Sequence, residues 1–175
     1  RTIRALRDGK PLAIPRFDKA RDDRAPVAEW PRWEGRCDLV IFEGWCVGAR
    51  PQRVDELREP INALEREDDP TGDWRFYVNR ELGGHYQGLF AEIDALLMLR
   101  PDSFERVVQW REQQEARLRE SGGGPQVMAP EAVRRFVMYF ERLTRFMWEE
   151  MPERADAVVH LGENHVPEHV ELGDG

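Results

Sequence analysis

The sequence has 175 residues, of which 41% are hydrophobic, and carries a formal net charge of −8. This length suits one domain, or most of one, with a sizeable core. The negative charge argues against a general binder of nucleic acid or of anionic membranes. No apolar run reaches the ~18–20 residues of a membrane-spanning helix, and no signal peptide is evident. We therefore expect a cytoplasmic protein with no membrane and no nucleic-acid partner, whose oligomeric state is left open.

The charge is distributed unevenly along the chain. Residues 1–36 carry ten Lys or Arg against six Asp or Glu, a net charge of +4, and the remainder carries a net charge of −12. A basic segment on an acidic protein suits a small anionic substrate better than a polymer, although ordinary surface scatter explains the charge alone equally well. With only Cys37 and Cys46 present, a disulfide framework is not expected and a reducing compartment fits.

The first third of the chain predicts short elements around a charged loop. Residues 1–8 suggest the end of a helix that stops at Gly9. A short strand follows over 12–15, and residues 20–36 suggest a surface loop rich in charge and proline. Leu39-Val-Ile-Phe42 is a continuous apolar run, typical of a strand buried on both faces of a parallel sheet.

The rest of the chain alternates predicted helices and strands. Pro60 should break a helix over 54–66, and Gly83-Gly84 should weaken a longer amphipathic helix that starts at Asp73. We then expect a strand over 95–99, a helix opened by Pro101, a helix opened by Pro130, a strand over 157–161 and a polar, frayed tail over about 162–175. This order predicts an α/β fold in which helices flank a mostly parallel sheet, in a single domain over 1–175.

Two motifs suggest phosphoryl-transfer chemistry. Glu43 follows the apolar run in Phe42-Glu-Gly44, the Walker-B arrangement, where a carboxylate orients magnesium or its bound water. Asp18 stands beside Lys19, with Asp22, Asp23 and Arg24 close behind, which offers a base and several cations. Each motif alone is more often an ordinary strand end or a solvated loop. However, the chain has only two lysines, and one of them lies in this motif.

The helix that follows Pro101 changes character along its length. Its first half is apolar, but from Arg111 to Gly122 nearly every residue is charged or polar, so the distal half should project or move. It carries Arg111, Arg117 and Arg119 and could form an arginine-bearing lid over nucleotide phosphates, although a solvated helix is the commoner explanation. His160, His165 and His169 fit no standard zinc spacing. Neither Gly122-Gly-Gly124 nor the segment around Lys10 matches a nucleotide-binding loop.

Together these pieces resemble a known family. The segments that carry the resemblance are Pro15-Arg-Phe-Asp-Lys19 with Asp22-Asp-Arg24, Asp38-Leu-Val-Ile-Phe-Glu-Gly-Trp45, Pro60-Ile-Asn62 and Gln109-Trp-Arg-Glu-Gln-Gln-Glu115. They are similar to plant-type D-glycerate 3-kinases and their bacterial and yeast kinase-like relatives, within the P-loop kinases related to phosphoribulokinase, uridine kinase and pantothenate kinase. The similarity runs from about Leu6 to Asn164.

The resemblance implies a P-loop NTPase-like fold and an ATP-dependent kinase that uses Mg²⁺ and converts D-glycerate to 3-phosphoglycerate. It makes Asp18 the acceptor-activating carboxylate and Glu43 the Walker-B-like acid and metal ligand. Lys19 and Arg24 would contact the substrate carboxylate or the transferred phosphate, and Asn79 and Tyr86 are further substrate-side residues. Arg111 and Arg117 would lie in a lid segment over about 109–125.

One departure from the family is large. The family's N-terminal strand, Gly-x-x-x-x-Gly-Lys-[Ser/Thr] loop and helix, which bind phosphate and magnesium, are absent from residues 1–175. We therefore expect the chain alone to be inactive and to form the C-terminal part of a kinase domain. The alternatives are a non-catalytic binding or assembly module derived from a P-loop kinase, and a related kinase acting on another small hydroxylated substrate.

Overall fold

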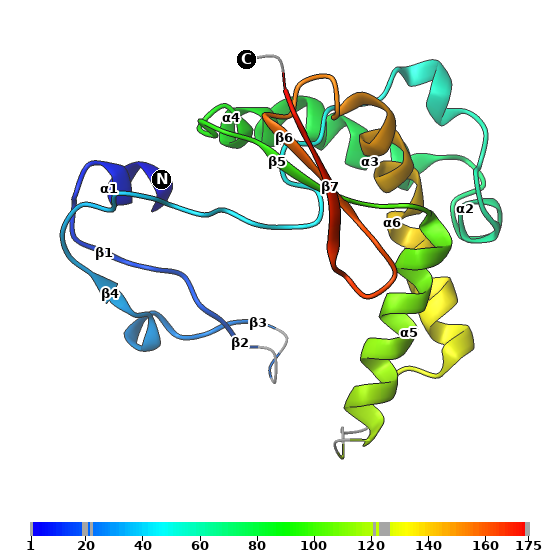
Figure 1. Ribbon diagram of the computed structural model, residues 1–175, viewed down its shortest axis with the longest axis horizontal. Coiled ribbons are helices and arrows are strands. Elements are labelled where there is room, and N and C mark those ends of the chain that lie inside the picture. The colour runs from blue at the N-terminus through cyan, green and yellow to red at the C-terminus, as the bar shows by residue number, and fades with distance from the viewer. Residues whose placement is uncertain (1, 19–20, 22, 121, 123–126, 174–175) are drawn as a thin grey trace. The chain divides into compact units, whose positions relative to one another are not determined.

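The chain forms two compact units, Arg1–Trp45 and Cys46–Gly175, in a computed structural model that describes residues 2–18, 21, 23–120, 122 and 127–173 (Figure 1). Lys19 and Asp22 of the charged motif lie outside the described residues, as do parts of the expected lid segment and the last two residues. The expectation of a single domain over the whole chain stays a prediction.

The first unit is a helix followed by a long β-hairpin. Its elements are α1 (Thr2–Arg7), β1 (Leu12–Ala13), β2 (Phe17–Asp18), β3 (Asp23–Arg24), the 3₁₀ turn η1 (Val27–Glu29) and β4 (Arg32–Trp33). Both ladders, β1 with β4 and β2 with β3, are antiparallel. Helix α1 ends as expected, because Gly9 adopts a left-handed φ of 68° that glycine reaches without a steric penalty.

The strand expected over 39–42 is absent, and this prediction is wrong for the described structure. Residues 39–44 have no regular secondary structure, and Leu39 and Ile41 are 76% and 80% exposed. An apolar run becomes a strand only where a neighbouring strand takes up its backbone N–H and C=O groups. None of the described strands pairs with this segment. The apolar composition of residues 39–42 therefore predicted a buried strand, but no described strand pairs with this segment and most of its side chains are exposed.

The second unit combines a three-stranded sheet with helices. Its elements are η2 (Val54–Leu57), α2 (Ala63–Asp68), α3 (Asp73–Glu81), the π-helical turn η3 (Leu82–Tyr86), α4 (Gln87–Phe90), β5 (Leu97–Pro101), α5 (Phe104–Glu120), α6 (Pro130–Glu150), β6 (Ala157–Leu161) and β7 (Pro167–Leu172). The expected break near Pro60 and the weak point at Gly83-Gly84 are both confirmed, the latter as the π-helical turn. Every described helix is too short or too polar to cross a bilayer.

The sheet has the strand order β5-β6-β7, in which β5 and β6 are parallel and β7 is antiparallel to β6. The mixed α/β fold with a parallel strand pair is therefore confirmed. Two details are wrong. Pro101 ends β5 instead of opening α5, which begins at Phe104. The tail is not frayed over 167–172, because these residues pair with β6 in a register that places His169 opposite His160.

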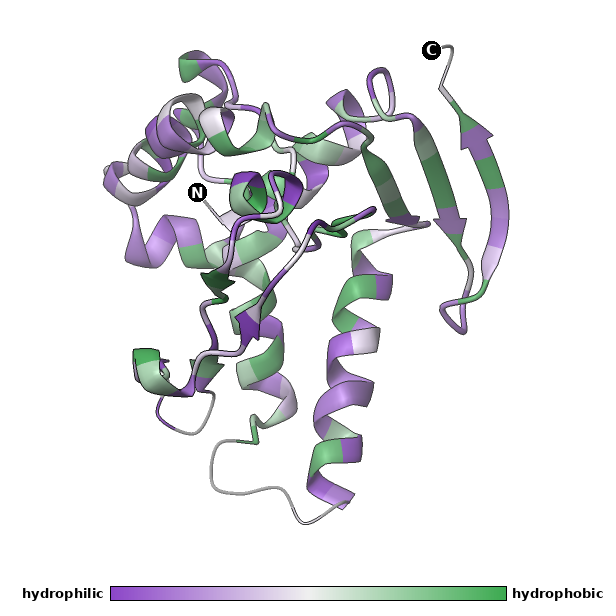
Figure 2. Cartoon of the chain, turned by 90° about the vertical axis from the view of Figure 1, so that its left-hand side faces the viewer, coloured by the Kyte–Doolittle hydropathy of each residue, from purple (hydrophilic) through white to green (hydrophobic). Residues whose placement is uncertain are grey.

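Helix α6 supplies the centre of the core. Pro130 is its first residue, as expected, and its apolar stripe reaches two hydrophobic clusters. Near its start, Val133 and Val137 pack with Phe104 of α5. Near its end, Leu143 and Met147 pack with the sheet residues Met98 and Val158 and with other apolar side chains of the unit. Figure 2 shows that hydrophobic and hydrophilic residues alternate along α6, whereas the distal half of α5 is largely hydrophilic.

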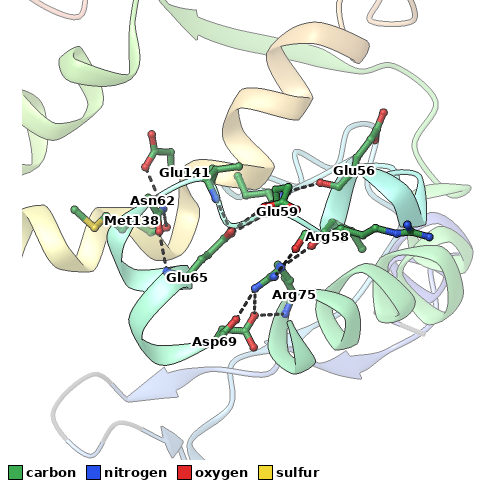
Figure 3. Close-up of polar contacts among 12 residues, drawn as sticks. Glu56, Arg58, Glu59, Asn62, Glu65, Asp69, Arg75, Met138 and Glu141 are labelled. Carbon is green, nitrogen blue, oxygen red and sulfur yellow. Dashed lines mark hydrogen bonds and ion pairs between the residues drawn. The ribbon is translucent and has the colours of Figure 1, made fainter. Parts of the chain in front are cut away.

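A buried polar network fastens α2 to α6 (Figure 3). Asn62 caps α2 by accepting the Glu65 N–H at 2.9 Å and donates to the Met138 carbonyl of α6 at 3.0 Å. Arg142 of α6 donates from Nη2 to Glu65 Oε2 at 2.6 Å, and both side chains are only about a tenth exposed. The Pro60-Ile-Asn62 motif is thus explained by a helix cap and a tertiary hydrogen bond.

A second part of the network holds α3 against the chain that precedes α2. The Arg75 guanidinium is 7% exposed and donates to the carbonyls of Leu57, Arg58 and Asp69 and to the Asp69 carboxylate. A buried cation is tolerated only when its donors are paired in this way. Arg75 therefore fixes three consecutive segments of the unit relative to one another.

The Glu65–Arg142 pair predicts a pH dependence of stability. Burial raises the pKa of the Glu65 carboxyl, but hydrogen bonds from Arg142 and from the Ile61 N–H outweigh burial, and the net shift of the pKa is downward. Because the pKa is lower in the folded than in the unfolded chain, this contribution to stability is complete above the unfolded pKa of about 4.3. It is lost as the pH falls through the folded pKa.

We expect the free energy of unfolding of the chain, measured in urea between pH 7 and pH 3, to decline below about pH 4.3. Glu65→Gln should lower stability at pH 7 and flatten this decline, because glutamine cannot titrate. Glu153→Gln, at a site with no such network, is the control. Equal pH profiles for wild type and Glu65→Gln would contradict the prediction.

Candidate functional site

The tip of the hairpin in the first unit carries the charged motif. Strands β2 and β3 pair Phe17 with Arg24 and Asp18 with Asp23. The Asp18 side chain is 27% exposed, and its Oδ2 lies 3.5 Å from Arg21 Nε. Asp23 Oδ1 accepts the N–H of Arg24 at 2.6 Å. The structure therefore places Asp18 opposite Asp23 on the ladder and beside the guanidinium of Arg21.

The pairing of Asp18 with Asp23 has a physical consequence. Like charges directly opposite one another on an antiparallel ladder are destabilising, and Arg21 beside Asp18 offsets part of this repulsion. A partly exposed carboxylate that can accept a hydroxyl proton is what an alcohol needs in order to become a nucleophile. Asp18 is a suitable group for that role, and Arg21 supplies positive charge beside it. Arg24 occupies the neighbouring ladder position, opposite Phe17, where successive side chains point to opposite faces of the strand.

Two hydrogen bonds help to hold the arms of the hairpin, one from a tryptophan side chain and one from a backbone N–H. Trp30 Nε1 donates to the Ala25 carbonyl at 2.7 Å, and Ala25 is 3% exposed. Ile14 N–H donates to the Pro31 carbonyl at 2.9 Å, which continues the β1–β4 ladder. These bonds fix the two chains that lead to the tip and so limit where Asp18 and Arg24 can lie.

The structure does not place Glu43 at a strand end. Glu43 is exposed and lies in the segment without regular structure. Among the described residues, no group of three or more His, Cys, Asp or Glu side chains has the arrangement of a metal site. The metal role of Glu43 therefore stays a prediction.

Two residues expected near the substrate have clear contacts within the second unit. The Asn79 side chain bonds to both backbone groups of Gln52, accepting its N–H at 2.7 Å and donating to its carbonyl at 3.0 Å. Tyr86 lies in the π-helical turn, is 44% exposed and has its ring 5.9 Å from that of Phe90. Asn79 therefore has a fastening role in this structure, whereas Tyr86 remains accessible.

The two arginines expected in the lid lie on α5 in different surroundings. Arg111 donates to the Glu115 carboxylate, whose residue is 3% exposed, and its guanidinium lies 5.4 Å from the Phe136 ring of α6. Arg117 is exposed and forms no ion pair with the carboxylates that the structure describes. The substrate and nucleotide roles of all these residues stay predictions.

Sequence reasoning missed Glu115 as a structural residue. Its Oε1 accepts from Arg111, and its Oε2 accepts the Met128 N–H at 3.0 Å. Arg119 donates to the Met128 carbonyl at 3.1 Å. Glu115 and Arg119, one turn apart on α5, thus bind the N–H and the carbonyl of Met128, which lies in the segment that connects α5 to α6. The available signal was the Arg111–Glu115 spacing of four, which places the two side chains side by side on a helix.

Comparison with known proteins places these features in a family, although no family model matches the chain. The chain is 30% identical over 144 residues to the protein named D-glycerate 3-kinase, chloroplastic, of Arabidopsis thaliana, covering 78% of this chain and 29% of that protein. It is 32% identical over 113 residues to the uncharacterized kinase mug58 of Schizosaccharomyces pombe, covering 62% of this chain and 40% of that protein. The chain belongs to the D-glycerate 3-kinase-like family.

Solved structures confirm the fold of this D-glycerate 3-kinase-like chain. A D-glycerate 3-kinase from Cryptococcus neoformans matches with a TM-score of 0.72 at 24% identity, over 93% of this chain and 60% of that one. The YGR205w protein matches with a TM-score of 0.60 at 20% identity, over 98% of this chain and 62% of that one. The chain spans well under half the length of the two curated relatives.

The contrast between the two α5 arginines predicts different effects on stability. Arg111→Ala should lower the free energy of unfolding by about 1–3 kcal/mol, because it leaves the buried Glu115 carboxylate without its charged donor. Arg117→Ala should change it by less than about 0.5 kcal/mol. Urea denaturation followed by circular dichroism measures both. Equal effects of the two substitutions would contradict this assignment.

Proposed function

We propose that this chain is the acceptor-side part of an ATP-dependent kinase, and that the complete protein phosphorylates D-glycerate to 3-phosphoglycerate. The observation that supports this most is the 30% identity to a D-glycerate 3-kinase over 78% of the chain. It is joined by a hairpin tip where the partly exposed Asp18 carboxylate lies beside Arg21, with Arg24 at the next ladder position. Such a set suits an anionic substrate that carries a hydroxyl group.

In this proposal, Asp18 accepts the proton of the acceptor hydroxyl as that oxygen attacks. Phosphoryl transfer asks little covalent chemistry of a protein, so positioning and charge neutralisation dominate. Arg24, which follows Asp23 in β3, attracts the carboxylate of the substrate. Lys19, which follows Asp18 in the sequence, is a second cation for it. The short ladder of β2 and β3 sets the spacing between the base and the cation.

The residues of this chain do not account for the phosphoryl donor. The 175 residues contain no Gly-x-x-x-x-Gly-Lys-[Ser/Thr] loop, which is the segment that cradles nucleotide phosphates in P-loop enzymes. No described cluster supplies a magnesium site. We therefore propose that the complete protein binds ATP and Mg²⁺. This chain contributes the residues that bind the acceptor, the catalytic base and the arginines of α5.

We expect the complete protein to release ADP from ATP when D-glycerate is present, measured in a coupled assay. Asp18→Asn should lower kcat by about 10²–10⁴-fold, the usual contribution of general-base catalysis, with an unchanged unfolding midpoint. Asp8→Asn, which removes an exposed carboxylate paired with Lys10, is the matched control and should retain activity. A near-normal rate for Asp18→Asn would remove the catalytic assignment.

The identity of the acceptor is tested in the same assay by comparing D-glycerate with other small hydroxy acids and polyols. A higher kcat/KM for a different acid would keep the kinase and replace the substrate. A folded complete protein that turns over none of them would favour the non-catalytic module.

A further inference from the structure

Helix α5 is held on two opposite faces. With 3.6 residues per turn, Phe104, Arg111 and Glu115 fall on one face, and Arg106, Trp110 and Arg117 fall on the other. The first face packs against α6, as the contacts of Phe104 with Val133 and of Arg111 with Phe136 show. Val107, Val108 and the ion pair of Glu112 with Arg134 at 2.8 Å widen this α6-facing surface, so contacts of the second face add a separate restraint on the orientation of α5.

The second face contacts the turn between β6 and β7. Trp110 stacks on His165 with ring centroids 4.1 Å apart and an interplanar angle of 26°. Trp110 Nε1 also donates to the Glu163 carbonyl at 3.1 Å, and Arg106 Nη1 lies 3.6 Å from Glu163 Oε1. We call Trp110, Glu163 and His165 the clasp. Figures 1 and 2 both show this turn beside the first half of α5.

The backbone of the clasp turn is unusual. His165 has a φ of 60°, the one positive φ of a non-glycine residue in the described part of the chain. A positive φ is uncommon for any residue other than glycine, although histidine adopts it more readily than most. The turn is closed by hydrogen bonds from the His165 N–H to the Gly162 carbonyl and from the Gly162 N–H to the Val166 carbonyl. This conformation brings the imidazole onto the indole.

The clasp lies at the carboxyl ends of the parallel strands β5 and β6. The turn follows the carboxyl end of β6, and α5 follows the carboxyl end of its parallel neighbour β5. In open α/β sheets, ligands bind outside the carboxyl ends of the strands. Arg117 lies seven residues beyond Trp110 on the same helix face, about 10 Å further along the axis. Arg111 lies on the opposite face and is committed to Glu115.

We infer that Trp110 and His165 are positioning residues that orient α5 so that Arg117, and not Arg111, is offered to the phosphates of a nucleotide bound at this edge of the sheet. The inference rests on the proposed kinase function for its nucleotide. Arg117 is the phosphate-binding group, whereas the clasp acts through the orientation of the helix and makes no contact with the ligand.

The clasp itself is tested without any substrate. The chain is labelled with 5-fluorotryptophan, which gives one ¹⁹F signal for each of its six tryptophans, and Trp110→Phe identifies the signal of Trp110. His165→Asn tolerates the left-handed backbone but removes the ring. We expect the Trp110 signal alone to shift and trypsin to cleave after Arg117 several times faster. His165→Arg, whose planar guanidinium can stack on the indole, should restore slow cleavage.

An unshifted Trp110 signal in His165→Asn would show that the stack does not exist in solution. A shifted signal without faster cleavage would show that the stack does not hold α5. Either result overturns the inference. Ala129→Ser, at the N-cap of α6 and away from the clasp, controls for nonspecific loosening and should leave both readouts unchanged.

The role of Arg117 is tested in the complete protein by steady-state kinetics. Arg117→Ala and His165→Asn should each raise the KM for ATP by about tenfold with kcat and the KM for the acceptor nearly unchanged. The double variant should raise the KM for ATP by less than the two single effects combined, because both substitutions remove the same contact between Arg117 and the nucleotide. Equal effects of Arg111→Ala and Arg117→Ala on the KM for ATP would overturn the choice between them. Absence of ATP turnover in the wild type would remove the proposed function and the role of Arg117, while the fluorine and trypsin results would still decide the clasp.

Discussion

The second unit depends on the apolar stripe of α6. This single helix joins the cluster under α5 to the cluster under the sheet, with Val133 and Val137 at one end and Leu143 and Met147 at the other. Burial of each such side chain is worth about 1.5–3 kcal/mol. The polar side of the same helix carries Arg142, which reaches Glu65 and the turn before α2. One helix therefore orders the sheet, α5 and α2 at once.

The candidate site combines a rigid base with accessible charge. In the first unit, ladder and tryptophan hydrogen bonds fix the chains that lead to Asp18 and Arg24, while the tip keeps two carboxylates opposite one another at an electrostatic cost. In the second unit, Arg111 of α5 is paired with the buried Glu115 carboxylate, whereas Arg117 is exposed.

Much of the fold was predictable from local pattern. The stripe of α6, the break at Pro60 and the strand at Ala157–Leu161 follow from periodicity and proline chemistry. Two of the failures, at 39–42 and at 167–172, have one cause. Leu39–Phe42 has strand composition but no described partner, and Pro167–Leu172 has a polar composition but pairs with β6. A strand is defined by hydrogen bonds to a neighbour, and these are invisible in the sequence of the segment itself.

By itself, the sequence determined the family, the charged hairpin residues and the arginines of α5, because these depend on residue identity and spacing. Only the tertiary structure decided which arginine is committed to a buried carboxylate and which shares a face with Trp110. It also decided that Asn62 and Asn79 fasten backbone and that Asp18 lies opposite Asp23. The physical reason is that a side chain's role depends on its partners, and these partners come from distant segments that folding brings together.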